Sequence, residues 1–562
     1  MSRHSLRALL PWAALAPVFA LVVLYPMCAT IVQSLHAGGA LSLANYRALV
    51  DPADRANMEA VGNSLTVSLL SVLLSGALGL FLAFVFTQFR FPLRGVLGRL
   101  AVLPVALPPL VGVIAFLFVF GETGIIPRGL QLLTGSSSAM LAAGGVSGIL
   151  LVHVYSFHVY FYLFASAGLR SLDASALEAA EGLGGGSWRT FRSVVLPALR
   201  PGLVAASALT FMSSMASFTA PLLFAGGKHF LTLEIYSTKL NGDLDLAAAQ
   251  SVLLTCVSLL FYLLLTLGPP RGAAYAGKGV RPPGVLRTGP LARRLMVASA
   301  LLVLALEMLP VLAIVALSFA REGSWTTGWI PSSWTGANYA AFVEDPGLLI
   351  PLGNSLVMAL IALAASLLFG VAAAALVAGR KNRIARAWSN ILLTMPYAVP
   401  GTVVAVSLIL AFNRELLAGV VPVLVGTFWI LPLAYFVREY PVVVRSVAAA
   451  LEGMDPTLME AAAGLGAGAT RRFRFVTLPA ILPALVSGGV LVLIASLGEF
   501  VSSILLYTYA SRPVSVEILA QLRLFNIGTA SAEAVMLMGI ILILLRVQGG
   551  LLAYDRRFSY VL

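Results

Sequence analysis

Charged residues are scarce in this chain. Asp, Glu, Lys and Arg together make up only 10% of its 562 residues, whereas 59% are hydrophobic. A water-soluble domain has roughly 25% charged and 45–50% apolar residues. The composition therefore excludes a soluble globular protein, because one core cannot hide so many apolar side chains from water. We expect an all-α polytopic membrane protein, since helices satisfy their own backbone hydrogen bonds in lipid.

Cysteine is also nearly absent. The two residues, Cys28 and Cys256, lie within apolar runs, which excludes a disulfide framework. Catalytic signatures are missing as well: the sequence has no HExxH, GxSxG or CxxC pattern. His153 and His158 are five residues apart, so they do not share a helical face and do not predict a metal pair. We therefore expect neither an enzyme nor a resident cofactor.

The net charge of +13 could indicate a nucleic-acid partner, but no basic, aromatic-rich soluble segment is present to bind one. In membrane proteins Lys and Arg collect in the cytoplasmic loops. With the N-terminus inside, most of the 36 basic residues, Arg438 among them, fall in segments on the inner side. The charge pattern therefore predicts no nucleic acid and places both termini in the cytoplasm.

About twelve apolar runs have the length of about 20 residues that a helix needs to cross a bilayer. The first, residues 8–31, is too long for a signal peptide and suits a first span. The weakest runs contain prolines, at Pro104 and Pro108 in the third span and at Pro396 and Pro400 in the ninth. Neighbouring helices can satisfy the backbone groups that such prolines free. We therefore expect about 12 transmembrane helices.

A pattern that occurs twice is the most specific signal in the chain. It reads Glu-Ala-Ala, three residues, Gly, nine residues, an aliphatic residue, one more residue, and Leu-Pro. The copies are Glu178, Ala179, Ala180, Gly184, Val194, Leu196 and Pro197, and Glu460, Ala461, Ala462, Gly466, Val476, Leu478 and Pro479. Every position of the second copy follows its partner by the same interval, about half the chain. This agreement indicates a duplicated chain, because chance repetition at seven positions is negligible.

The two halves also match outside this pattern. The matched stretches are Gly62-Asn63-Ser64-Leu65 with Gly353-Asn354-Ser355-Leu356, Pro104-x-Ala106-x-Pro108 with Pro396-x-Ala398-x-Pro400, and Phe218 with Phe500. We predict two parallel six-helix repeats, residues 1–268 and 295–562, since an even number of spans gives both halves the same orientation. A cytoplasmic linker rich in Gly, Pro and Arg, residues 269–294, would join them. The repeated loops, 178–197 and 460–479, would then both be cytoplasmic.

Each repeated loop has the composition of a short helix that docks on a partner. Glu178 to Leu183 can form one turn or two, and Gly184 can end the helix. The small side chains of Ala179 and Ala180 leave a smooth surface that suits insertion into a groove. The alternative is an amphipathic connector lying on the membrane. That alternative does not explain why the same residues recur at the same spacing in both halves.

The two loops resemble the EAA loop of importer-type ABC permeases, and the chain as a whole resembles a tandem permease of the ferric-iron type and its relatives. The resemblance implies a transport pathway in the bacterial cytoplasmic (inner) membrane, with ATP hydrolysis by separate subunits. It implies two ABC ATPase subunits on the cytoplasmic side, coupled through both Glu-Ala-Ala loops, and an extracytoplasmic substrate-binding protein. Ferric iron is the first substrate hypothesis. Thiamine, phosphonate, polyamine or an oxyanion are alternatives.

One stretch of the linker approaches a P-loop but does not complete it. Gly272 to Lys278 fits the first seven positions, but Gly279 stands where Ser or Thr must bind magnesium. Val280, Arg281 and two prolines follow, and they cannot open the required helix. Nucleotide binding by this chain is therefore not expected.

Ionisable residues inside spans are costly and are candidates for function. Glu499 lies in the span that follows the second repeated loop, and we predict that it lines the pathway together with Phe500. Ser217 and Phe218 lie at the matching place in the first half. The alternative for Glu499 is a buried carboxylate with a structural role only. A secondary transporter driven by an ion gradient is the rival class, but it does not predict a repeated docking loop.

Overall fold

The computed structural model describes residues 15–52, 55–135, 141–172, 174–183, 186–266, 289–325, 330–379, 382–417 and 419–558. Within these ranges the chain is almost entirely helical, as the composition predicts. The only sheet among the described residues consists of two antiparallel strands of two residues each, β1 and β2. Most of the linker predicted at residues 269–294, with the P-loop-like stretch, lies outside the described residues.

The elements of the first half are η1 Ala20–Leu24, α2 Tyr25–Ser34, β1 His36–Ala37, β2 Ala40–Leu41, α3 Ala44–Ala48, α4 Arg55–Gln88, α5 Arg94–Leu100, α6 Leu103–Ala106, α7 Pro109–Phe120, α8 Ile125–Thr134, α9 Gly145–Ser171, α10 Ala174–Gly182, α11 Ser187–Thr190, η2 Phe191–Val195, α12 Leu196–Met215, α13 Thr219–Phe224, α14 Leu231–Leu240 and α15 Leu244–Thr266.

The elements of the second half are α16 Pro290–Ser318, α17 Ala337–Glu344, η4 Pro346–Leu348, α18 Ile350–Ala378, α19 Arg383–Thr394, η5 Met395–Ala398, α20 Gly401–Phe412, α21 Ile430–Gly453, α22 Pro456–Gly464, α23 Ala469–Arg472, η6 Phe473–Thr477, α24 Leu478–Leu497, α25 Val501–Leu506, α26 Val514–Arg523 and α27 Ile527–Phe558. The labels η1, η2 and η6 are π-helices, and η4 and η5 are 3₁₀-helices.

Ten helices among the described residues are long and apolar enough to cross a membrane. The pair Ile384–Ala398 and Gly401–Phe412 counts as an eleventh span if its 98° bend lies within one crossing. The bend falls at Pro400, one of the prolines that mark this span as weak in the sequence. The remaining predicted span corresponds to α21, which is 24 residues long but carries Arg438, Glu439 and Arg445. The predicted number of about twelve is thus higher than length and composition alone support.

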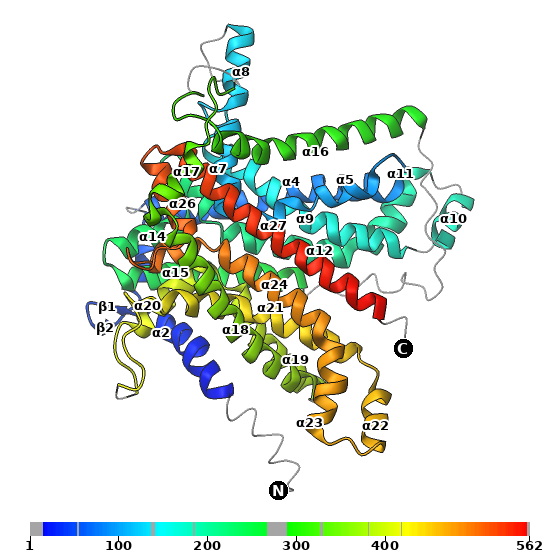
Figure 1. Cartoon of the computed structure of the whole chain (residues 1–562), viewed down its shortest axis with the longest axis vertical. Helices are drawn as coiled ribbons and strands as arrows, with labels where there is room; N and C mark the ends of the chain where they lie inside the picture. Colours follow the sequence, from blue (N-terminus) through cyan, green and yellow to red (C-terminus); the bar gives the residue numbers. More distant parts are fainter. Residues whose placement is uncertain are drawn as a thin grey trace. The chain divides into compact units, whose positions relative to one another are not determined.

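The described chain divides into two compact units. One comprises Tyr46–Ser237 and Leu253–Thr335, and in it α4, α9 and α12 pack together. Its core includes Leu82 and Phe86 of α4, Tyr162 of α9 and Leu199 of α12. Helix α16, the first span of the second repeat, packs against α7 and α4 of this unit (Figure 1). Ala300 and Leu304 of α16 are fully buried in the same core.

The other unit comprises Met1–Asn45, Thr238–Val252 and Gly336–Leu562, and in it α18, α21 and α24 run side by side (Figure 1). Helix α2, the first span of the first repeat, packs against α20 of this unit. The ring of Tyr25 meets Phe412 edge to face at 6.5 Å, and Thr30 Oγ1 donates to Ser407 Oγ at 2.7 Å. The first span of each repeat is therefore packed with spans of the other repeat. The boundaries of the repeats themselves stay a prediction.

Helices α4 and α9 approach so closely that a glycine is required between them. A Cβ atom on Gly79 would collide with the backbone oxygen of His158 and would lie 2.6 Å from Phe161 Cβ. Small residues at such contacts let membrane helices pack backbone to backbone. The sequence of α4 therefore fixes this crossing at one position.

We expect Gly79→Leu to destabilise the protein by at least about 3 kcal/mol, because overpacking a tight contact forces the backbones apart. Thermal melting of the purified protein in detergent would measure the loss. Gly62→Leu is the matched control on the same helix, since a Cβ on Gly62 meets nothing within 4 Å. Equal melting temperatures for the two variants would contradict this account of the α4–α9 contact.

Candidate functional site

The second Glu-Ala-Ala loop forms a capped helix, α22. The Asp455 side chain accepts from the Thr457 backbone N–H at 2.9 Å, and Pro456 begins the helix. The same hydrogen bond holds the pKa of Asp455 below its ordinary value. Because Asp is a preferred N-cap and Pro a preferred first residue, the start of α22 is encoded locally.

The end of α22 requires a glycine. Gly466 has φ +76°, in the left-handed region that other residues avoid. Its N–H bonds the oxygen of Ala463, and the N–H of Ala467 bonds that of Ala462, so carbonyls of the last turn are satisfied. The helix therefore ends where the sequence predicts, and the chain turns sharply into α23.

The surface that α22 presents matches that of α10 in the first loop. Glu460 and Ala461 are exposed and Ala462 is half-buried, and Glu178, Ala179 and Ala180 show the same pattern. Gly184 lies outside the described residues. Beyond the alanines, Leu465 is 89% exposed and its partner Leu183 is 87% exposed. A single exposed leucine is ordinary on a protein surface, but its recurrence at matched positions gives the two loops the same apolar edge.

Each loop joins the next span through a π-helical turn, which the sequence did not predict. The turns are η2 and η6, and in each the N–H of the following leucine, Leu196 or Leu478, bonds a carbonyl five residues earlier. The proline after each leucine, Pro197 or Pro479, cannot donate, and its ring crowds the carbonyl four residues before it. The widened turn accommodates that proline inside a continuous helix. The Leu-Pro end of the motif thus marks the joint between loop and span.

Glu499 lies in a break between α24 and α25 and is almost fully buried. Arg438 Nη1 of α21 lies 2.6 Å from Glu499 Oε1. The backbone N–H groups of Ser502 and Ser503 donate to the same carboxylate at 3.0–3.1 Å. The charge is therefore both paired and hydrogen-bonded, as burial requires.

A second helix break meets the first at Arg438. Helix α20 starts at Gly401 after the sharp bend at Pro400, and Ser502 Oγ donates to the Gly401 oxygen at 3.3 Å. A Cβ on Gly401 would collide with the Arg438 guanidinium. Broken helices that meet around polar groups form the ion and substrate sites of many transporters. The charge pattern of the sequence places Arg438 in a cytoplasmic segment. In the structure Arg438 lies within helix α21 and is part of this site.

The first repeat has the same break with uncharged chemistry. Ser217 occupies the break between α12 and α13, at the position that matches Glu499. His153 Nε2 lies 2.9 Å from Ser217 Oγ, and His153 Nδ1 lies 2.9 Å from Ser71 Oγ. In both repeats a hydroxyl group further along the chain donates to a backbone carbonyl of the break. Thr232 Oγ1 donates to the backbone oxygen of Ser217, and Ser515 Oγ donates to the backbone oxygen of Glu499. The geometry is duplicated, but only the second copy carries charge.

The two aromatic residues predicted to line the pathway, Phe218 and Phe500, lie in the breaks as the N-caps of α13 and α25, and both are fully buried. Their rings are surrounded by neighbouring side chains and do not line an open surface. His158 Nε2 lies 3.3 Å from Glu307 Oε1, a buried contact between α9 and α16 that sequence analysis did not connect. Among the described residues no group of three or more His, Cys, Asp or Glu could hold a metal ion.

The sequence family described as "Binding-protein-dependent transport system inner membrane component" matches the chain twice, at residues 75–268 and 366–553. A probable ABC transporter permease protein of Sinorhizobium fredii is 31% identical over 514 residues, which cover 90% of this chain and 88% of the relative. The ferric transport system permease protein FbpB of Actinobacillus pleuropneumoniae is 26% identical over 86% of this chain and 70% of its own length.

A shorter match concerns one repeat. The molybdenum transport system permease protein ModB of Mycobacterium bovis is 33% identical over 206 residues, 36% of this chain and 76% of the relative. The two matched segments each contain one Glu-Ala-Ala loop and the span that follows it. The chain belongs to the family of binding-protein-dependent transport system inner membrane components, as a multi-pass ABC importer permease of the inner membrane that contains two permease repeats in tandem.

Proposed function

We propose that this chain forms the complete transmembrane pathway of an importer for ferric iron, with α10 and α22 as its coupling helices. The observation that carries the proposal is the matched pair of exposed Glu-Ala-Ala helices, each ending in an exposed leucine. A chain that belongs to this family needs ATPase and binding-protein partners. Two docking helices in one chain fit two ATPase subunits, one on each loop.

The proposed orientation puts α10, α22 and both termini in the cytoplasm. The density of arginine around the loops supports this side, since Lys and Arg collect there. Arg471, Arg472 and Arg474 follow α22 directly, and Arg189 and Arg192 follow α10. Closure of the ATPase subunits would move α10 and α22, and the joints at η2 and η6, which are continuous with the following helices, would pass that movement to α12 and α24.

The proposed pathway follows the two helix breaks. Glu499 and Phe500 belong to one break, and Ser217 and Phe218 belong to the other. Movement of α12 or α24 would change the position of its own break, because each break directly follows that helix. This connection links the coupling loops to the polar residues through one continuous element in each repeat.

Ferric iron is the proposed substrate because a ferric permease is similar to this chain over most of its length. An oxyanion is the second candidate, since a molybdenum permease is similar to one repeat. Arg438 would suit an anion and Glu499 a cation, so the buried pair does not by itself choose between them. Thiamine, phosphonate and polyamine remain alternatives of the same machinery. An ion-driven secondary transporter is disfavoured by the family to which the chain belongs.

Uptake into proteoliposomes tests the proposal. The chain, its ATPase and its binding protein are reconstituted together, and radiolabelled ferric iron, molybdate and thiamine are offered in parallel. We expect ATP-dependent ferric uptake that needs the binding protein and survives ionophores. Preference for another compound would replace the substrate, and uptake driven by an ion gradient without ATP would overturn the whole proposal.

A further inference from the structure

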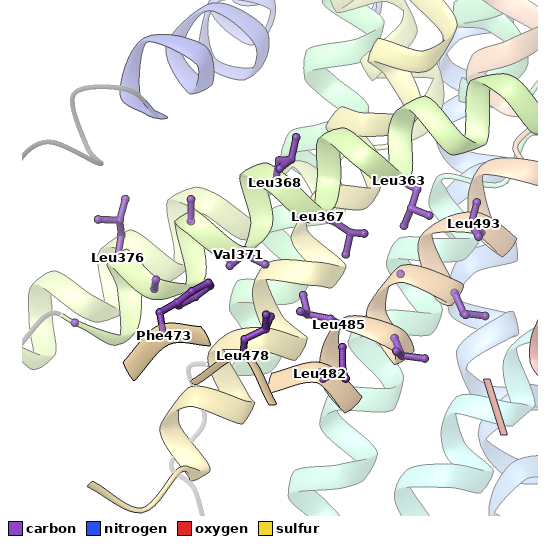
Figure 2. A pocket seen from close by; sticks show the side chains of 16 residues that line it. Leu363, Leu367, Leu368, Val371, Leu376, Phe473, Leu478, Leu482, Leu485 and Leu493 are labelled. Atoms are coloured by element: carbon purple, nitrogen blue, oxygen red, sulfur yellow. The ribbon is translucent and has the colours of Figure 1, made fainter. Parts of the chain in front are cut away.

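A large apolar groove lies between α18 and α24, and one end of it reaches the joint η6 that follows the second Glu-Ala-Ala loop. Its volume is about 1310 Å³, and every residue that lines it is apolar. Figure 2 shows Leu363 and Leu493 at one end of the groove, and Leu376 and Phe473 at the other. Because α18 and α24 belong to membrane spans, this groove opens among helices that lipid surrounds.

The two repeats differ in side-chain size along this groove. The matched stretches at Gly62 and Gly353 align Ala372 and Ala375 of α18 with Phe81 and Phe84 of α4. In the first repeat both phenylalanines pack against the buried core of their unit. In the second repeat the alanines leave that volume open, and both line the groove.

The dimensions of the groove suit an acyl chain. From Leu363 to Gly379 the helix rises about 24 Å, at about 1.5 Å per residue, which is most of the hydrocarbon thickness. A rigid polar solute would gain nothing from walls without hydrogen-bonding groups. A flexible hydrocarbon chain can fill the space and gain contact along its whole length.

Three arginines flank Phe473, the residue at one end of the groove, in the sequence. Arg471, Arg472 and Arg474 are sequence neighbours of Phe473, and the Arg474 guanidinium lies 5.7 Å from the centre of the Phe475 ring. Within the described residues the buried Arg472 Nε has no hydrogen-bond acceptor. Basic groups beside an apolar site at the membrane surface attract anionic headgroups.

We propose that the α18–α24 groove binds an anionic phospholipid of the leaflet next to the coupling loops. Its acyl chains fill the space over Ala372 and Ala375, and its phosphate binds Arg472 and Arg474. The site rests on the orientation given under the proposed function. Phe473 and Leu478, which line the groove, also belong to the joint between α22 and α24, so a bound lipid supports the element that carries movement from the loop.

Native mass spectrometry of the purified full chain tests this site directly. The protein is mixed with phosphatidylglycerol or phosphatidylcholine of the same chain length, and retained lipid is counted at rising collision energy. We expect at least one tightly held phosphatidylglycerol. Ala372→Phe combined with Ala375→Phe, which copies the first repeat, is expected to remove it. Ala364→Phe is the control, since Ala364 is exposed on the same helix and does not line the groove.

Variants of the arginines proposed to bind the headgroup test the site even if the variant with Ala372→Phe and Ala375→Phe folds poorly. Arg472→Gln and Arg474→Gln should each reduce the preference for phosphatidylglycerol about fivefold, in line with one basic residue near an anionic surface. Equal retention of both lipids by the wild type would overturn the anionic site, as would retained lipid in the filled variant. A membrane protein held in the groove in place of lipid would also overturn it. ATPase assembly is measured on the same samples, so failure of coupling and failure of lipid binding are told apart.

Discussion

Replacing Glu178 and Glu460 together with Arg is expected to abolish uptake and to release the ATPase from purified complexes. Both carboxylates are exposed on short helices, so their charge is available to a partner and serves no buried pair of this chain. Reversing a charge at a docking surface places like charges opposite each other, which weakens binding by about a hundredfold per site. Co-purification of the ATPase and ATP-dependent uptake would both be measured.

The control for this double variant is Glu415→Arg, another exposed carboxylate, which lies in the segment between α20 and α21. It makes the same Glu-to-Arg reversal at one position, half the total charge change of the double variant, and leaves both loops intact. Melting in detergent should be unchanged in all variants, because none of these carboxylates is buried. If uptake persists when both loops carry Arg, then α10 and α22 are not the coupling helices.

The repeat and its loops were predictable because their information is local. Asp455 and Pro456 start α22, and Gly466 ends it, whatever the rest of the chain does. Because the chain is duplicated, each of these features could be identified independently in both halves. The third span of each repeat was likewise predictable as weak, from Pro104 and Pro108 and from Pro396 and Pro400. Helices α7 and α20 begin directly after Pro108 and Pro400.

The partners of buried residues were not predictable in the same way. Hydropathy shows that residues 15–34 are apolar but does not say which helix covers them, so the packing of α2 against α20 had no sequence signal. Arg438 looked like a loop cation because its span is the least apolar of the second half. Its pairing with Glu499, which is distant in sequence, depends on three helices that meet in space. The π-helical turns η2 and η6 were not predictable, because they result from the local backbone effect of a proline and leave no periodic pattern of apolar residues in the sequence.

The second prediction with a large expected effect concerns the Glu499–Arg438 pair at the break between α24 and α25. Glu499→Ser or Arg438→Ser alone should destabilise the protein by about 3–5 kcal/mol, because each leaves a charge without its partner. The double variant should regain most of that loss. It places Ser at both positions, as in the first repeat, where Ser156 and Ser217 stand at the matching positions, and it leaves the buried Glu439 next to position 438. Melting in detergent would follow all three variants.

Uptake then separates a structural pair from a pathway residue. If Glu499 and Arg438 only hold α21 against α25, the stable double variant should transport like the wild type. The pathway proposal expects uptake to remain at least about tenfold lower, equivalent to about 1.4 kcal/mol on the limiting barrier. The control is the pair Arg512 and Glu517, whose atoms are also 2.6 Å apart with Glu517 buried. Replacing both with Ser removes a pair of the same kind outside the break, so it should leave uptake per folded molecule unchanged.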